Sequence, residues 1–294
     1  MPDSQFSRIV LLGHTGYIGR RLAVAFKKAA PGTPVVGRSV SELDLTQTAA
    51  SSELEQLFDA DAAVVICAAI KKQLGDTLEA LTQNLAITTA ICRALVSSPV
   101  KRVLFFSSAA VYGEDVQHGT ITESTPVEPT SFYGIGKFTA ERLLMKTAGQ
   151  QPGTSLLMLR PALVYGPDEP GYYYGPSGFL QKARAGSPIT LWGDGTELRE
   201  FLHIDDVVDV TTRLLFSAAT GVLNVVSGVS YTYTAALEEI AKVTGTPPVT
   251  DSRARSKDKV DHKFDSAALM RACPEFRFTT LVEGLAKTAQ EARG

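Results

Sequence analysis

Residues 8–19 read RIVLLGHTGYIG, and this stretch decides the fold of the chain. The apolar run in Arg8–Leu12 is typical of a buried parallel strand, and the glycine-rich turn after it leads into a helical pattern over Arg20–Ala29. Glycines spaced G-x-x-G-x-x-G let the turn tighten and let its backbone approach a pyrophosphate, whose charge is attracted to the amides of a helix N-terminus. The stretch therefore predicts a dinucleotide site, and a turn that only packs helix on strand is the alternative. The turn residues expected to contact the dinucleotide are Gly13, His14, Thr15, Gly16, Tyr17, Ile18 and Gly19.

Strand and helix patterns alternate from residue 8 to about residue 160, which predicts an α/β fold with a Rossmann-type doubly wound parallel sheet. Strands are expected at Arg8–Leu12, Pro34–Gly37, Ala62–Cys67, Arg102–Ser107 and Ser155–Arg160. Helices are expected at Tyr17–Ala29, Ser51–Leu57, Thr77–Ser97 and Phe132–Thr147. After Tyr165 the chain changes to Gly-, Pro- and Tyr-rich loops and shorter elements such as Val207–Ser217 and Thr234–Thr244. We expect a dinucleotide-binding domain over residues 1–165 and a smaller substrate lobe over residues 166–294, with the chain crossing back between them.

A second apolar run ends in serines, where residues 103–113 read VLFFSSAAVYG. Such a run is typical of a central strand whose carboxyl end opens onto the crevice in which α/β sheets bind ligands. A serine hydroxyl at that place can hydrogen-bond a substrate oxygen. Serines at a strand end are ordinarily turn formers or caps, so this motif indicates a site only in combination with others.

Tyr133 and Lys137 lie four residues apart in a helical pattern, so both side chains leave the same face of one helix. A phenol beside an ammonium is a useful acid–base unit, because the positive charge favours the phenolate and is expected to lower the pKa of the phenol from about 10. A bare Tyr-x-x-x-Lys pair is common on helices. It gains meaning here from the glycine turn and the serine strand.

Composition excludes several classes of protein. With 294 residues the chain has ample material for a core, and its formal net charge of −2 gives no reason to expect nucleic acid or an acidic membrane as a partner. Cys67, Cys92 and Cys273 are few, odd in number and without metal-ligand spacing, so we expect reduced thiols in a cytoplasmic compartment and no metal. No apolar run approaches about 20 residues, and the N-terminus does not read as a signal peptide.

Taken together, these motifs resemble the extended short-chain dehydrogenase/reductases, in particular the branch of nucleotide-sugar epimerases, dehydratases and reductases. The resemblance covers nearly the whole chain. Its further motifs are R-P-A-L-V-Y-G-P at residues 160–167, G-D-G-T-E-L-R-E-F at residues 193–201 and a last-helix motif at residues 278–285. It implies a catalytic triad of Ser108, Tyr133 and Lys137, with Tyr133 as acid–base, Lys137 lowering its pKa and holding the cofactor ribose, and Ser108 positioning the reacting oxygen. It also places Asn84 at the family's asparagine in the helix before the serine strand.

The choice of cofactor rests on the end of the second strand. Folds that select NAD usually place an acid there, but residues 35–39 read VVGRS without one. Arg38 can instead clamp a 2′-phosphate with its fork of donors, which favours NADP(H). A surface arginine that leaves the choice to the following loop is the alternative, with NAD(H) as cofactor. By resemblance Asp44 and Leu45 contact the adenine, and the small residues Ala68 and Ala69 lie where the backbone of the cofactor passes.

The reaction type stays open between two enzymes. Dehydratases of this branch carry an acidic pair after the catalytic hydroxyl, and this chain has Ala109 and Ala110, which cannot shuttle the protons that expel water. A 4-keto-sugar reductase using NADPH is favoured by Arg38 and by the likeness of residues 37–45 to deoxysugar reductases. A 4-epimerase with bound NAD is favoured by the S-S-A-A-V-Y-G run. A non-sugar hydroxy/keto substrate is a further alternative, and a non-catalytic regulator would be expected to have lost Tyr133 or Lys137.

In the substrate lobe, Arg199 is expected to grip the diphosphate of a nucleotide sugar, and Trp192 resembles a residue lining the nucleotide pocket. An arginine paired with Glu200 or Asp205 is the alternative. Leu163 replaces an asparagine that many relatives use to contact the substrate phosphate. Tyr172–Tyr174 form either a lid or simple packing. By resemblance the chain forms a homodimer through the helix of Tyr133 and the long helix before it, for which Phe138, Leu143, Leu144 and Met145 are suited unless they face the sheet.

Overall fold

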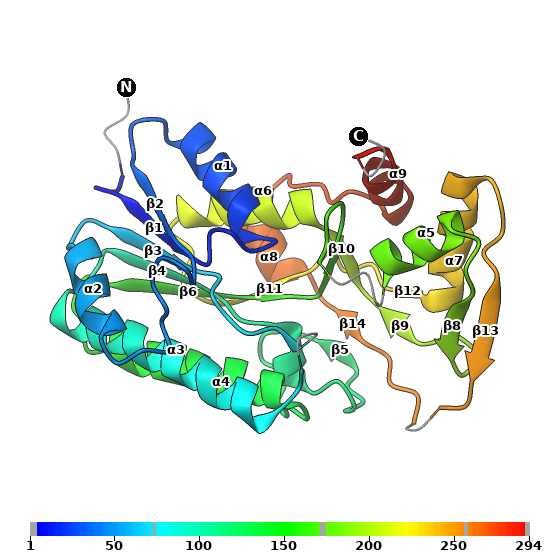
Figure 1. The fold of residues 1–294 in the computed structure, drawn as a ribbon, viewed down its shortest axis with the longest axis horizontal. Helices are drawn as coiled ribbons and strands as arrows, with labels where there is room; N and C mark the ends of the chain where they lie inside the picture. Colours follow the sequence, from blue (N-terminus) through cyan, green and yellow to red (C-terminus); the bar gives the residue numbers. More distant parts are fainter. Residues whose placement is uncertain (1–4, 73–74, 171–174, 256–257, 292–294) are drawn as a thin grey trace. The chain divides into compact units, whose positions relative to one another are not determined.

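The computed structural model describes residues 5–72, 75–170, 175–255 and 258–291, and Figure 1 shows their arrangement. An α/β unit is built on a six-stranded sheet with the strand order β11-β6-β4-β3-β1-β2. The strands are β1 (Ile9–Leu12), β2 (Val35–Arg38), β3 (Ala63–Ile66), β4 (Arg102–Phe106), β6 (Ser155–Pro161) and β11 (Gly221–Val225). The pairings of β1 with β2, β1 with β3, β3 with β4 and β4 with β6 are all parallel. The predicted fold class is confirmed.

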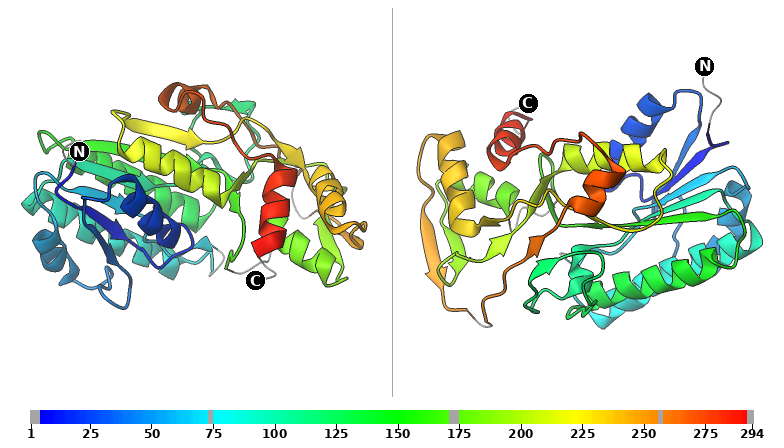
Figure 2. Two further views of the ribbon diagram at one scale, coloured as in Figure 1. Left: turned by 90° about the horizontal axis from the view of Figure 1, so that it is seen from above. Right: turned by 180° about the vertical axis from the view of Figure 1, so that it is seen from behind.

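Helices cover both faces of this sheet (Figure 1). They are α1 (Gly19–Ala29), α2 (Ala50–Leu57), α3 (Leu78–Ser97), α4 (Phe132–Ala148) and α6 (Ile204–Leu215). Figure 2 shows α3 and α4 running side by side on one face. Both helices start at a capping hydroxyl that the sequence supplies, since Thr77 accepts from the amide of Ala80 at 3.2 Å and Ser131 accepts from the amide of Gly134 at 3.1 Å.

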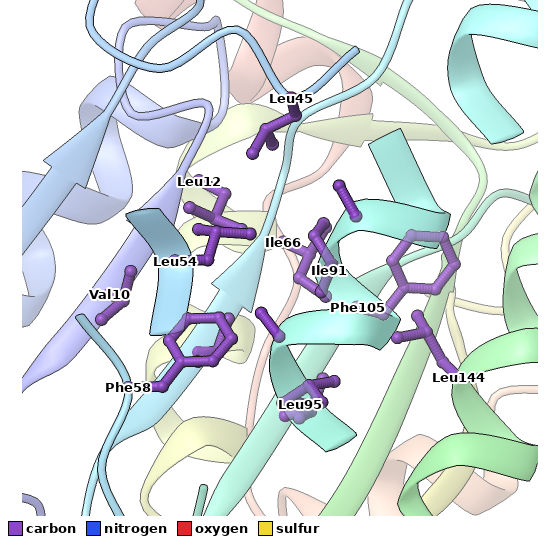
Figure 3. Packing of buried hydrophobic residues seen from close by; sticks show 14 of the residues in the cluster. Val10, Leu12, Leu45, Leu54, Phe58, Ile66, Ile91, Leu95, Phe105 and Leu144 are labelled. Carbon is purple, nitrogen blue, oxygen red and sulfur yellow. The ribbon is translucent and has the colours of Figure 1, made fainter. Parts of the chain in front are cut away.

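The main core lies between the sheet and helices α2, α3 and α4 (Figure 3). Leu12 and Ile66 from neighbouring strands face Leu54 and Ile91 from two of these helices, and all four are at most 2% exposed. All residues of β1 and β3 are buried, which is why both strands read as continuous apolar runs rather than alternating ones. Apolar burial of this kind contributes roughly 25 cal/mol per Å² and holds the sheet together.

The elements expected before residue 161 agree with the observed ones to within two residues, although α1 begins at Gly19 rather than Tyr17. Strand β11 has no counterpart among the expected elements. After β1 the chain forms β2 on one side and then returns to form β3 on the other. The carboxyl ends of β1 and β3 therefore form a topological switch point, where open α/β sheets bind ligands.

The chain divides into two compact units, and each contains more than one segment. The sheet unit comprises residues 1–114, 126–160 and 208–223, and the second unit comprises 115–125, 161–207 and 224–294. The second unit has the paired strands β5 (Thr120–Ile121) with β14 (Lys263–Phe264), β7 (Leu163–Tyr165) with β10 (Phe201–His203), β8 (Ile189–Trp192) with β13 (Thr250–Arg253), and β9 (Leu198–Arg199) with β12 (Tyr231–Thr232). Its helices are α5 (Pro176–Arg184), α7 (Tyr233–Thr244), α8 (Ala267–Ala272) and α9 (Leu281–Glu291).

Candidate functional site

The glycine turn joins the ends of three strands at the switch point. Gly13 has a φ of +84°, and a Cβ atom there would lie 2.8 Å from the backbone nitrogen of Ala68 after β3. Its amide donates to the carbonyl of Arg38 at the end of β2, at 2.7 Å. A Cβ atom on Gly19 would collide with the carbonyl oxygen of Gly13. Both positions therefore require glycine, because the backbone folds back on itself where no side chain fits.

The residues of this turn fit a dinucleotide. Helix α1 starts directly after the turn, has no side-chain cap at Ile18 and carries no acid in its first turn. A helix start of this kind presents backbone amides and a positive dipole end to an anion such as a pyrophosphate. Ala68 and Ala69 follow β3 at the same edge of the sheet, and both residues are partly exposed.

Glu42, an acid that was not assigned to cofactor choice from the sequence, lies four residues after the end of β2. Glu42 Oε2 accepts from the amide of Ser39 at 2.8 Å and from its hydroxyl at 2.7 Å, and it lies 3.6 Å from Nδ1 of His14. These hydrogen bonds lower the pKa of Glu42. Arg38 turns back on its own strand, and its Nη1 donates to the carbonyl of Gly37 at 2.8 Å. The S-x-x-E spacing of residues 39–42 is the capping-box signal that could have revealed this acid.

Three expected cofactor contacts have well-defined surroundings. The side chain of Asp44 accepts from the amide and hydroxyl of Thr46 and from Gln47, and these bonds lower its pKa. The side chain of Leu45 is 6% exposed and packs in the core, so only its backbone can face a ligand. Asn84 accepts from the amide of Ile70 at 2.8 Å and donates to its carbonyl at 3.0 Å. Asn84 thus fixes the loop that follows β3.

The structure brings Ser108, Tyr133 and Lys137 together. Ser108 follows β4, and its Oγ accepts from the amide of Ala110 at 3.1 Å. The side chain of Ser108 also acts on the phenol of Tyr133 and favours a lower pKa of that group. Lys137 is 7% exposed, and its Nζ donates to the carbonyl of Phe106 at 2.6 Å. The same Nζ lies 5.8 Å from the ring centroid of Tyr133.

The pKa of the Tyr133 phenol differs from the value expected from the sequence. Burial raises the pKa of Tyr133 to about 12, the hydrogen bond from Ser108 opposes this shift, and the charge of Glu114 adds to it. Burial also lowers the pKa of Lys137 to about 8, against the opposing effects of Cys67 and Glu141. The predicted fall in the pKa of the phenol is therefore wrong for this state of the protein, because the loss of hydration on burial is the largest effect on it. The phenol is protonated at neutral pH.

Residues outside the sequence motifs hold the helix that carries the cluster. Asp76 accepts from the amide of Tyr133 at 2.9 Å and so ties the first turn of α4 to the loop before α3. Lys72 forms an ion pair with Glu114, whose charge acts on the phenol. No short sequence pattern connects these residues with Tyr133, because they are about 20 to 60 positions away along the chain.

The two expected substrate contacts lie in the second unit. Trp192 ends β8 and is 45% exposed. Arg199 lies in β9, and its Nη1 donates to the carbonyls of Leu198 and Val260 at 2.8 and 2.6 Å rather than to the neighbouring acids. Leu163 is 42% exposed, and Tyr172–Tyr174 fall outside the described residues.

Two kinds of feature are absent from the described residues. None of the helices there is long and apolar enough to cross a membrane. Among the same residues, no group of three or more His, Cys, Asp or Glu side chains is arranged to hold a metal ion.

The chain is similar to known proteins in sequence and in fold. The model of the NAD dependent epimerase/dehydratase family matches residues 9–226. GDP-L-fucose synthase 1 of Arabidopsis thaliana is 29% identical over 262 residues, covering 81% of this chain and 78% of the plant protein. UDP-glucose 4-epimerase of Mycolicibacterium smegmatis is 27% identical over 90% of this chain and 80% of that protein. The solved structure of Thermus thermophilus UDP-glucose 4-epimerase in complex with NAD superposes with a TM-score of 0.82 at 25% identity, covering 98% of this chain and 99% of the other.

Proposed function

Because the chain belongs to the NAD dependent epimerase/dehydratase family, we propose that it is a 4-epimerase of a nucleotide-activated sugar. The observation that carries this proposal is the grouping of Ser108, Tyr133 and the buried Lys137, with the inert Ala109 and Ala110 directly after the serine. One phenol is then the acid–base group at the reacting oxygen. A 4-epimerisation removes a proton from one sugar oxygen and returns it to the same oxygen, so a single group is sufficient.

The residues of this chain divide the work as follows. Ser108 holds the sugar oxygen by a hydrogen bond. Tyr133 first has to release its own proton to solvent, and as the phenolate it takes the proton of the sugar oxygen while the alcohol becomes a ketone and gives it back when the alcohol reforms. The ammonium of Lys137 stabilises the phenolate, which burial otherwise disfavours. A nicotinamide dinucleotide held by the glycine turn supplies hydride acceptance and donation at the sugar carbon. Arg199 and Trp192 are the proposed contacts to the nucleotide part of the substrate.

NAD(H) is the proposed cofactor. The carboxylate of Glu42 is hydrogen-bonded to Ser39, the residue that follows β2. At this place its negative charge repels a 2′-phosphate and so disfavours the binding of NADP(H). Arg38 opposes this effect, although its guanidinium is engaged by the carbonyl of Gly37. Isothermal titration of the protein with NADH and with NADPH measures which of the two cofactors binds more tightly. We expect NADH to bind more tightly, and Glu42→Gln to narrow the difference, whereas a preference for NADPH that Arg38→Ala abolishes would overturn this choice.

A 4-keto-sugar reductase is the second candidate. It is favoured by Arg38 and by the similarity to a GDP-L-fucose synthase. A protonated phenol also suits the delivery of a proton to a ketone. Such an enzyme would consume one NADPH for each keto sugar and would not return the starting alcohol.

The decisive experiment supplies UDP-, GDP-, dTDP- and CDP-hexoses with NAD and follows inversion at C4 by proton NMR. We expect interconversion of one pair of sugars, and Tyr133→Phe should reduce turnover by at least about 10²-fold while cofactor binding is kept. A second assay measures NADPH consumption with a 4-keto sugar. Consumption of NADPH without C4 inversion would replace the epimerase by the reductase, and turnover unchanged in Tyr133→Phe would refute both.

A homodimer through α3 and α4 is part of this proposal. Exposed apolar side chains lie on both helices, including Leu78 and Val96 on α3 and Ile135 and Met145 on α4, whereas Leu144 faces the core. Apolar side chains on two adjacent helices suit burial against a second copy of the same pair. Light scattering of the wild type and of Ile135→Glu distinguishes a dimer from a monomer.

A further inference from the structure

Behind the three candidate catalytic residues lies a second group of polar side chains with no assigned function. Ser107 directly follows β4, whereas Tyr112, Glu141 and Arg160 come from three further elements. Each of the four side chains is at most 4% exposed. Buried polar groups are costly unless every one is paired. Their pairing therefore determines what this group does.

Glu141 and Arg160 form the centre of the group. Arg160 donates from Nε to Oε1 of Glu141 at 2.8 Å and from Nη2 to Oε2 at 2.6 Å, which is a bidentate pair. Its Nη1 donates to the hydroxyl of Tyr112 at 2.8 Å. The hydroxyl of Ser107 donates to Oε1 of the same carboxylate. This polar cluster of Ser107, Tyr112, Glu141 and Arg160 thus joins β4, the 3-10 helix Ala109–Tyr112, α4 and β6.

Each member adjoins a part of the candidate site. Ser107 directly precedes Ser108, and its amide donates to the carbonyl of Leu159 next to Arg160 at 2.8 Å. Tyr112 ends the short helix that Ser108 caps. Glu141 lies one helical turn beyond Lys137 and two turns beyond Tyr133, on the buried face of α4. The polar cluster therefore fixes the strand end that carries the serine relative to the helix that carries the phenol and the ammonium.

Glu141 also acts on Lys137 by its charge. The charged or titratable groups that face Lys137 are Tyr133 and Glu141 on its own helix and Cys67 at the end of β3. At neutral pH Glu141 supplies the negative charge that favours the ammonium, because burial raises the pKa of Cys67 to about 12 and that of Tyr133 likewise. Arg160 lies on the far side of Glu141 and holds the carboxylate in place.

We propose that Glu141 and Arg160 are positioning residues, which set the spacing of Ser108 and Lys137 and keep Lys137 protonated in its buried site. This inference rests on the proposed function in one respect only: the proposed function says which reaction the spacing of Ser108 and Lys137 supports. The titration of Lys137 itself can be measured without any substrate, so the two proposals can fail separately.

The test compares three variants by the pH dependence of kcat and by the ¹³Cε chemical shift of Lys137 in NMR spectra. Glu141→Gln removes the charge but leaves Arg160 unpaired, so it can lower stability as well. Glu141→Gln combined with Arg160→Met removes both charges, and replacement of both members of a buried pair is often tolerated. Tyr112→Phe keeps both charges and removes one hydrogen bond.

We expect the double variant to titrate Lys137 at a pH lower by roughly one unit than in the wild type. The alkaline limb of kcat should shift by the same amount. In Tyr112→Phe, kcat should fall several-fold with no shift of the limb and no change in KM. If Lys137 titrates at the wild-type pH in a folded double variant, the claim that Glu141 keeps Lys137 protonated is wrong. If kcat is unchanged in Tyr112→Phe, the claim that the polar cluster sets the spacing of Ser108 and Lys137 is wrong. If the wild type turns over no sugar, the NMR titration still decides the first point.

Discussion

Two buried glutamates, one in each unit of the chain, have opposite surroundings. Glu141 in the sheet unit and Glu200 in the second unit are each 1% exposed. Glu141 is held by a bidentate arginine and a serine hydroxyl. Glu200 accepts from the backbone amides of Ser227 and Gly228, while its Oε2 has no hydrogen-bond partner among the described residues. Burial raises the pKa of Glu200 to about 7.

The difference teaches that burial alone does not decide the charge of an acid. A carboxylate without a cation loses its hydration and takes up a proton, whereas one that is paired and hydrogen-bonded stays charged. In the sheet unit, the charge lies directly behind Lys137 of the candidate site. In the second unit, the acid ties the start of β10 (Phe201–His203) to the loop after β11.

Breaking the paired site should have the largest effect. Arg160→Met leaves Glu141 without its cation in a closed site, and we expect a loss of about 3 to 5 kcal/mol of unfolding free energy. Urea denaturation at pH 7 measures it. The loss should grow as the pH rises from about 5 to 8, because the lone carboxyl keeps its proton in the folded variant whereas the unfolded chain releases it. Arg160→Met together with Glu141→Leu should recover most of the stability, and a single-variant loss below about 1 kcal/mol would contradict the comparison.

Replacement of Glu200, the buried acid without a cation, should have a smaller effect on the unfolding free energy than Arg160→Met, and at alkaline pH it should stabilise the protein rather than destabilise it. The pKa of Glu200 lies above its ordinary value of 4.5, so the folded protein holds the proton more tightly than the unfolded one. Its contribution to stability is complete below about pH 4.5 and is lost as the pH rises to about 7, by at most about 3 kcal/mol. Glu200→Gln should abolish this slope, and its amide can still accept from the same backbone donors.

Denaturation of Glu200→Gln and the wild type at pH 5 and pH 8 checks this. The variant should be relatively more stable at pH 8. Asp209→Asn, which changes an exposed acid on α6, provides the control and should leave the slope unaltered. A wild-type slope that persists in Glu200→Gln would mean that other groups titrate in this range.

Breaking an exposed ion pair should have the smallest effect on the unfolding free energy. Arg213 and Asp209 are four residues apart on α6, 3.3 Å from each other, and both side chains are about half exposed. Arg213→Gln should change the unfolding free energy by less than about 0.5 kcal/mol, because solvent and salt screen the pair. Thermal melts at low and at about 0.5 M salt test this, and a loss comparable to that of Arg160→Met would show that exposure does not separate the two pairs.

The sequence by itself determined the features that depend on local spacing. Three glycines at intervals of three positions specify the turn of residues 13–19, where no Cβ atom fits at Gly13 or at Gly19. The interval of four between Tyr133 and Lys137 places both on one face of α4, whatever packs against it. Continuous apolar runs in the sequence identify β1 and β3 as strands. The order of these strands and the helices between them along the chain could therefore be predicted from the sequence.

Only the tertiary structure decided which distant groups meet and how dry their surroundings are. Glu141 meets Arg160, 19 positions away, because α4 packs beside β6. Strand β11 joins the central sheet although it lies about 60 residues beyond β6, the strand before it in that sheet. The pKa of Tyr133 rises rather than falls because desolvation depends on everything packed around the phenol. Spacing is written in the sequence, whereas burial and long-range pairing exist only when the whole chain has folded.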